Sequence, residues 1–155
     1  MATPGYATAY GRVDVDCLEP QRRLEGLLDT GATGYRPGML LKYTSNGKYI
    51  AHATQSGVGE CLILNIDSYS NGFDLEAGTK AAGDRVNIIV PRPGDSFLAL
   101  VANLQNIAMA DQLVSNGAGK FRKVNAATDF VFAIALDALD LSAAGADYHV
   151  VARRI

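Results

Sequence analysis

The sequence predicts an all-β fold, either a sandwich or a distorted barrel, preceded by an extended N-terminal arm. Short apolar runs recur from residue 38 onward with turn residues between them, and no long stretch has the apolar spacing of an amphipathic helix. Residues 1–37, by contrast, show no sustained strand or helix period. Closely spaced strands of this kind are typical of sandwiches and barrels. We therefore expect an arm over residues 1–37 and a β-rich core domain over residues 38–155.

The composition indicates one globular domain with no affinity for nucleic acid or membrane. The chain has 155 residues, of which 48% are hydrophobic and 19% are charged. Fourteen basic and sixteen acidic residues give a net charge of -2, and no basic stripe is present. No apolar run approaches the roughly 20 residues of a membrane helix, and the N-terminus lacks the apolar centre of a signal peptide. We expect synthesis in the cytosol, with Cys17 and Cys61 as free thiols.

The arm is read as extended, with local turns. Gln21–Leu28 could form a short helix, but Gly26 and the glycines that follow argue against a long one. Tyrosines in or beside the arm provide rigid amphipathic contact area, which suits docking onto another protein. Packing of the arm on its own domain is an equally open alternative. The interface residues that we expect are Tyr6, Tyr10, Arg12, Arg22, Arg23 and Tyr35.

Turn signals delimit the expected strands. Asn46-Gly47 and Asn116-Gly117 each stand between two apolar-containing runs, which is the strongest short hairpin signal because type I′ turns need positive φ values. Pro91 and Pro93 should stop the strand before them, since proline has no donor for a strand ladder. The expected strands are Met39–Thr44, Lys48–Thr54, Glu60–Asp67, Arg85–Val90, Phe97–Asn103, Gln112–Ser115, Lys120–Val124, Phe130–Leu136 and Tyr148–Arg153.

The Leu27–Ala32 segment, Leu-Leu-Asp-Thr-Gly-Ala, matches the signature of retroviral-type aspartic proteases. Two such aspartates meet at a dimer axis in those enzymes and share one proton. The later apolar runs lack the second, glycine-containing motif that this fold needs, so the favoured interpretation is that Asp29 caps a turn.

Other candidate chemistry is weaker. His52 and His149 have no partner motif for a catalytic triad or a metal site, and Asp137, Asp140 and Asp147 lack the spacing of a calcium loop. We expect no catalytic centre, no cofactor and no bound metal.

From Tyr35 onward the sequence resembles the head decoration, or structural cement, proteins of tailed phages. The resemblance covers roughly the last three quarters of the chain and rests on the order and spacing of its segments. They are 35–41 (YRPGMLL), Asn46-Gly47, 52–54 (HAT), 82–86 (AGDRV), 91–95 (PRPGD), 111–123 (DQLVSNGAGKFRK) and 150–155 (VVARRI). The family usually has a glycine within the stretch matching Ala102–Asn106 and a Gly-Asp at Ala110-Asp111. This chain has neither glycine.

The resemblance implies a β-tulip or jelly-roll-like domain on the outside of an expanded phage head. It also implies a major capsid protein as partner and a homo-oligomer, a trimer more often than a dimer. The N-terminal arm would extend over a neighbour. The alternatives that stay open are a generic virion interaction module, a carbohydrate-binding module and the protease acting through Asp29. The absence of Trp disfavours the carbohydrate-binding module, because sugars usually stack on aromatic side chains.

Overall fold

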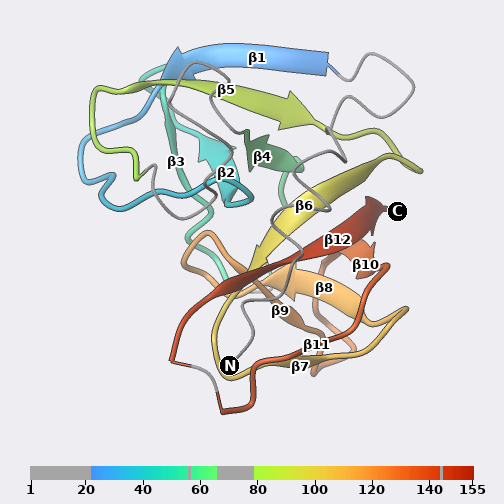
Figure 1. Ribbon diagram of the computed structural model, residues 1–155. Helices are drawn as coiled ribbons and strands as arrows, with labels where there is room; N and C mark the ends of the chain where they lie inside the picture. The colour runs from blue at the N-terminus through green and yellow to red at the C-terminus, as the bar shows by residue number, and fades with distance from the viewer. Residues whose placement is uncertain (1–21, 56, 66–78, 144) are drawn as a thin grey trace.

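The computed structural model describes residues 22–55, 57–65, 79–143 and 145–155, and these residues form β-strands and connecting turns (Figure 1). The prediction of an all-β fold is confirmed. Among the described residues, no helix is both long and apolar enough to span a membrane. The strands are β1 (Arg22–Leu27), β2 (Leu40–Tyr43), β3 (Tyr49–Ala51), β4 (Leu62–Leu64), β5 (Arg85–Val90), β6 (Ser96–Val101), β7 (Asn106–Ile107), β8 (Gln112–Ser115), β9 (Phe121–Lys123), β10 (Val131–Ala135), β11 (Leu139–Asp140) and β12 (Tyr148–Arg154).

Five strands of the first half form an antiparallel sheet in the order β1-β5-β4-β2-β3, in the upper part of Figure 1. The sheet curls so that its two edge strands approach each other: Leu28, directly after β1, forms a parallel bridge with Tyr49 at the start of β3. The Asp29 N–H also donates to the Tyr49 carbonyl at 2.8 Å. Both faces of the central strands are buried. Leu40, Ile63 and Ile89 belong to one apolar cluster, while Leu41, Leu62, Leu64 and Ile88 belong to the other.

The second half closes into a five-stranded barrel in the order β10-β12-β6-β9-β8. Its pairs are antiparallel except β6 with β9, which pair in parallel at Val101 and Phe121. Phe97, Phe121 and Phe132 are fully buried inside, and their rings meet at tilted or edge-to-face angles. The first apolar cluster therefore joins the barrel interior to one face of the sheet.

A short ribbon of β7 and β11 lies beside the barrel. Two turns next to β7 contain the described non-glycine residues with positive φ, Leu104 at 62° and Ala110 at 70°. Leu104 falls within the 102–106 stretch and Ala110 begins the Ala110-Asp111 pair, the two places where the resemblance to decoration proteins leads us to expect a glycine. The chain keeps the left-handed turns there without the residue that adopts them most easily.

Most predicted strands are confirmed, including both Asn-Gly hairpins and the stop of β5 before Pro91. Gly47 and Gly117 have positive φ values of 73° and 83°, but Asn46 and Asn116 do not have positive φ, so the turns are not the expected type I′ turns. The hairpin loops span residues 44–48 and 116–120. The expected Glu60–Asp67 strand is described as far as residue 65 and contains β4. The ribbon strands β7 and β11 were not predicted.

The expected arm, residues 1–37, lies outside the described residues as far as residue 21. Residues 22–27 form strand β1, paired with β5 over six residues, so the alternative of a short helix over Gln21–Leu28 was wrong. Pairing with a six-residue partner satisfies the backbone groups that a helix turn would otherwise satisfy. Leu28, Ala32 and Tyr35, which follow β1, are buried in the second apolar cluster.

Candidate interaction surface

Strand β1 lies at the edge of the sheet, and its first two residues, Arg22 and Arg23, are exposed. Farther along β1, Glu25 pairs with Arg85 at 3.4 Å, but both side chains are more than half exposed. Such a pair contributes little to stability. The polar start of β1 is thus an accessible surface rather than part of the core. The other expected interface residues Tyr6, Tyr10 and Arg12 lie outside the described residues.

Tyr35 is placed inside the fold. Its side chain is buried, and its hydroxyl oxygen accepts a hydrogen bond from the Ala51 N–H at 2.7 Å. Its backbone pairs with Lys80 in both directions, at 3.0 and 2.8 Å. Within the chain, this tyrosine therefore ties the 28–39 segment to β3. The exposed tyrosine of this region is Tyr43, which is 60% accessible and packs edge-to-face on Tyr49.

Asp29 forms the turn that follows β1. Its Oδ1 accepts a hydrogen bond from the Thr30 N–H at 2.8 Å, and its carbonyl accepts one from the Ala32 N–H at 3.2 Å. Gly31 continues the turn with a φ of 89°. This arrangement matches the turn-capping interpretation of the Asp-Thr-Gly segment, because the carboxylate is used by its own turn.

His52 lies between the sheet and the barrel. The Nδ1 atom lies 2.9 Å from the Ser115 Oγ, and the ring packs edge-to-face on Phe132. Burial lowers the pKa of His52, and the nearby positive charge of Lys42 acts in the same direction. Ser115 is fully buried and its Oγ also accepts the Gly117 N–H at 3.1 Å. The pair is inaccessible to a substrate and instead fixes the β8–β9 turn.

His149, Asp140 and Asp147 are also used within the fold. His149 Nε2 is 2.7 Å from the Pro37 carbonyl, and Asp147 pairs with Lys120 at 2.7 Å. The pKa of Asp140 is lowered by its hydrogen bond with Ser142. Among the described residues, no group of His, Cys, Asp or Glu is arranged to hold a metal ion.

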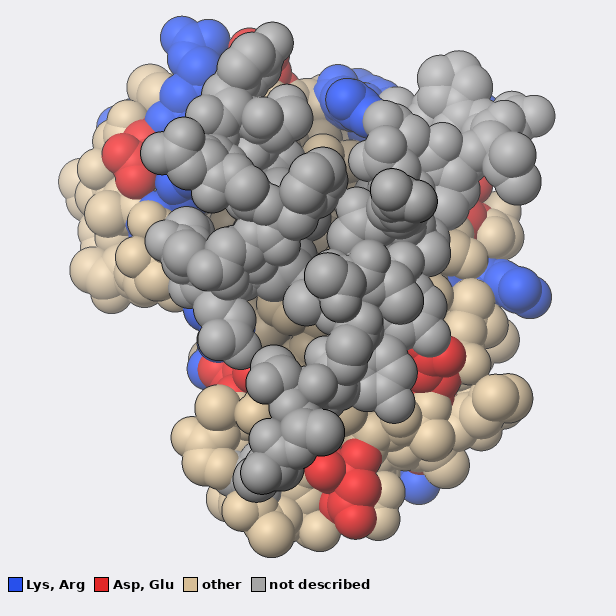
Figure 2. Space-filling model, in the orientation of Figure 1, with Lys and Arg blue, Asp and Glu red and all other residues tan. Residues whose placement is uncertain are grey.

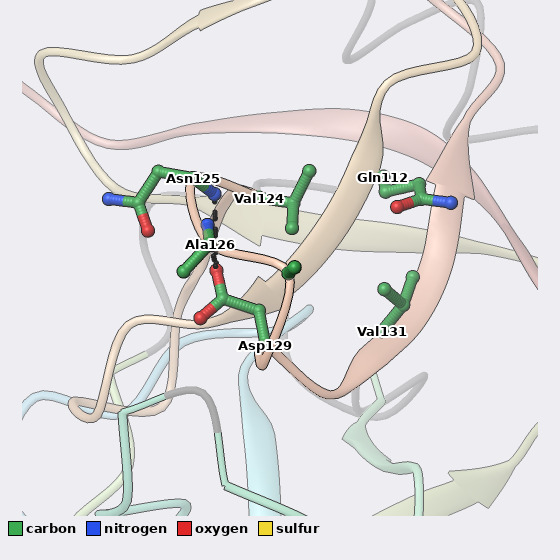
Figure 3. Close-up of a pocket in the computed structure, with 7 residues that line it drawn as sticks. Gln112, Val124, Asn125, Ala126, Asp129 and Val131 are labelled. Atoms are coloured by element: carbon green, nitrogen blue, oxygen red, sulfur yellow. Dashed lines mark hydrogen bonds between the residues drawn. The ribbon is translucent and has the colours of Figure 1, made fainter.

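A shallow depression of about 390 Å³ lies between β8 and the loop that leads to β10 (Figure 3). Of the described residues that line it, Asp129 is the charged one. Its Oδ2 accepts hydrogen bonds from Asn125 N–H at 3.1 Å, Ala126 N–H at 3.3 Å and Arg122 Nη2 at 3.1 Å. Because this oxygen already accepts three hydrogen bonds, Asp129 holds the surrounding loop in place and has little remaining capacity to bind a ligand.

Cys61 is buried in the cluster that joins the sheet to the barrel, and burial raises the pKa of its thiol to about 12. A thiol with such a pKa stays protonated at neutral pH and is unreactive. Cys17 lies outside the described residues.

No known family model matches this chain, and no curated protein matches it. Its fold is similar to a solved structure described as the head fiber gp8.5 N base in bacteriophage phi29. The two share 12% sequence identity with a TM-score of 0.55, and the match covers 86% of this chain and 95% of that one. At this identity the match shows a common fold, and it extends over nearly the whole of the fiber base.

Proposed function

We propose that this chain is a structural protein of a phage head, bound to the outside of the expanded capsid, which it stabilises as a cement protein. The observation that supports this most is the fold shared with the phi29 head fiber base over 95% of that chain. The order of motifs from Tyr35 to Lys123 supports it independently, because those motifs resemble decoration proteins. The partner would be the major capsid protein, contacted by a homo-oligomer, with a trimer favoured over a dimer.

The mechanism is thermodynamic. A protein that binds the assembled shell but not its separated subunits stabilises the shell by RT ln(1 + [L]/Kd) per site. The stabilising free energies of many copies on one shell add up. Within an oligomer, binding of one subunit raises the effective concentration of the others at their sites, which strengthens binding of the whole oligomer. In the proposal, residues 1–21 contribute part of this contact through Tyr6, Tyr10 and Arg12, and Arg22 and Arg23 continue it onto the sheet edge.

The name of the phi29 structure favours a second candidate. A fiber base is an anchor, so this chain could attach a further module to the head without stabilising the shell. Both candidates predict binding to the head exterior, and they differ in what binding does to the shell.

Co-sedimentation with capsid shells tests the binding itself. Shells assembled from the major capsid protein of the same phage, in compact and expanded forms, are mixed with the purified chain. We expect saturable binding to the expanded form. Absence of binding to both forms would contradict the proposal, and proteolysis and glycan binding would then be tested.

A variant that lacks residues 1–20 tests the arm. We expect it to keep the cooperative thermal unfolding of the core, since the described sheet begins at Arg22, and to lose retention on expanded shells. Unchanged retention would show that the arm is not part of the contact.

A further inference from the structure

Four strand ends meet on one side of the molecule, at the right of Figure 1. Arg22, at the start of β1, lies opposite Val90 at the end of β5. The chain then turns through residues 91–95 into β6, whose first residue, Ser96, lies opposite Arg153 near the end of β12. The topology therefore brings Arg22, Arg92 and Arg153 to the same side, although they are up to 131 residues apart in sequence. We name these three residues the strand-end surface.

The turn that presents Arg92 is held rigidly. The Asp95 carboxylate accepts the Arg92 N–H at 2.8 Å, and the Asp95 N–H donates back to the Arg92 carbonyl at 2.9 Å. Gly94 N–H donates to the Arg154 carbonyl, and Arg154 N–H donates to the Asp95 carbonyl, which fastens the turn to β12. Pro91 and Pro93 restrict φ on either side. A side chain on such a turn loses little backbone entropy when it binds.

Arg22, Arg92 and Arg153 are all exposed residues. Within the part of the chain that the structure describes, no carboxylate lies within ion-pair distance of Arg22, Arg92 or Arg153. Elsewhere in the described chain, cations do pair: Lys120 with Asp147, Arg122 with Asp129 and Lys123 with Asp111. In the view of Figure 2, Lys and Arg atoms stand out at the right of the molecule and also at its upper left. Among the described residues, this end of a protein of net charge -2 thus carries three exposed arginines without a carboxylate partner, while Lys42 and Lys48 on the β2–β3 hairpin are likewise without one.

All three residues are arginine, and the five lysines of the chain lie elsewhere. The guanidinium group binds a carboxylate through two parallel hydrogen bonds, and it is less strongly hydrated than an ammonium group. Arginine is accordingly enriched in protein interfaces and lysine is depleted there. The residue type therefore suits recognition of carboxylates on a protein surface.

We propose that the strand-end surface is a docking site for an acidic patch of a partner protein, with Arg22, Arg92 and Arg153 paired to its carboxylates. The inference rests on the proposed function, in which that partner is the outer face of the capsid shell. Nucleic acid is the less fitting partner, because three separated arginines form no stripe along which a phosphate backbone could run.

The test compares two variants of equal net charge. Arg92→Glu/Arg153→Glu reverses the strand-end surface, and Lys42→Glu/Lys48→Glu makes the same charge change on the β2–β3 hairpin, at the left of Figure 1. Retention on expanded shells is measured from about 50 mM to about 500 mM NaCl, a range over which exposed ion pairs are progressively screened. We expect the strand-end variant to bind roughly tenfold more weakly at low salt, and the hairpin variant to bind like the wild type.

The same proteins are passed over immobilised poly-glutamate, which presents carboxylates without the shell. We expect the strand-end variant to elute earlier than the hairpin variant. Equal elution of the two would overturn the docking site, regardless of the result for retention on shells. Binding to poly-glutamate with no binding of the wild type to shells would support the surface while contradicting the proposed function. Tighter binding to a DNA duplex than to poly-glutamate at the same salt would overturn the choice of a protein partner.

The variant Arg92→Gln/Arg153→Gln is a control for loss of binding through misfolding, because it removes the two positive charges without introducing negative ones. We expect the melting temperature of this neutral variant to match the wild type and its shell retention to fall. A wild-type level of retention would overturn the proposal.

Discussion

His52 Nδ1 and Ser115 Oγ lie 2.9 Å apart in a buried contact that joins the segment after β3 to the end of β8. The Gly119 N–H donates to the His52 carbonyl at 3.1 Å, so the side chain and the backbone of His52 hold the same β8–β9 turn. This histidine therefore links the two halves of the fold through a neutral ring.

We predict that stability falls as the pH is lowered through the range just below 6.5. Burial sets the pKa of folded His52 below its ordinary value of 6.5. In the interval between the two values, the unfolded chain binds a proton that the folded chain does not. Stability is thus fully present above pH 6.5 and decreases toward the folded pKa, by at most about 1.4 kcal/mol per pH unit. Thermal unfolding measured at a series of pH values between about 7.5 and about 5 checks this predicted loss of stability.

His52→Gln separates this effect from other titrating groups. Glutamine keeps a polar contact with Ser115 but does not titrate, so the melting temperature of the variant should vary less with pH over the same range. An unchanged pH profile would show that His52 is not the group responsible.

The ring of Tyr49 lies against Gly26, where an added Cβ would be 2.2 Å from the Tyr49 Cε2. We predict that Gly26→Ala lowers the free energy of unfolding by about 1–3 kcal/mol, because the ring must shift within a packed cluster. Denaturant unfolding measures the loss. Gly145→Ala is the control, since a Cβ there meets no atom within 4 Å, and it should be close to neutral. A tolerated Gly26→Ala would mean that Tyr49 moves freely.

Ala110 adopts a φ of 70° in an exposed turn next to β7. We predict that Ala110→Gly leaves stability unchanged or raises it by up to about 1 kcal/mol, because glycine relieves the strain while adding entropy to the unfolded chain. The nearby exposed Ala108, which is not among the positive-φ residues, is the control. Ala108→Gly should lower the melting temperature, and an equal loss at both positions would contradict the strain argument.

Arg122 and Asp129 form an ion pair whose side chains are 9% and 4% exposed, at 3.1 Å. We predict that Asp129→Ala lowers the free energy of unfolding by roughly 3 kcal/mol or more, since it leaves a buried guanidinium without its carboxylate and frees the 124–129 loop. Glu25→Ala removes one partner of the exposed Arg85 pair, and it should cost less than about 1 kcal/mol. Urea unfolding of the two variants tests the contrast, and similar losses would contradict it.

The fold was largely predictable because its signals are local. The hairpins at Asn46-Gly47 and Asn116-Gly117 and the stop at Pro91 each depend on one or two residues, and all three are found where they were expected, although the asparagines do not adopt the positive φ of a type I′ turn. Strand β1 was harder, since its pattern of Arg, Leu, Glu and Gly has no clear period and its pairing with β5 joins residues about 60 apart. Non-local pairing of this kind is not visible in a single segment of sequence.

The candidate surface was predictable only in part. Arg22 and Arg23 were expected from their position and stay a prediction, whereas Arg92 and Arg153 enter the proposed surface only because the β6–β12 register brings them to the same side as β1. The signal that could have indicated Arg92 is its place between two prolines, which keeps it out of a strand and in a turn. For Tyr35, residue type suggested an interface, but the hydrogen bond to Ala51 that occupies its hydroxyl depends on the folded sheet.

Heat disruption of expanded shells, with and without the bound chain, tests the central claim most directly. Shells are saturated with the protein, and their disassembly temperature is followed by light scattering beside bare shells and shells incubated with the 1–20 deletion variant. The account predicts that the disassembly temperature rises with occupancy and that the deletion variant has no effect. Saturable binding that leaves the disassembly temperature unchanged would contradict the cement function and favour an anchoring base.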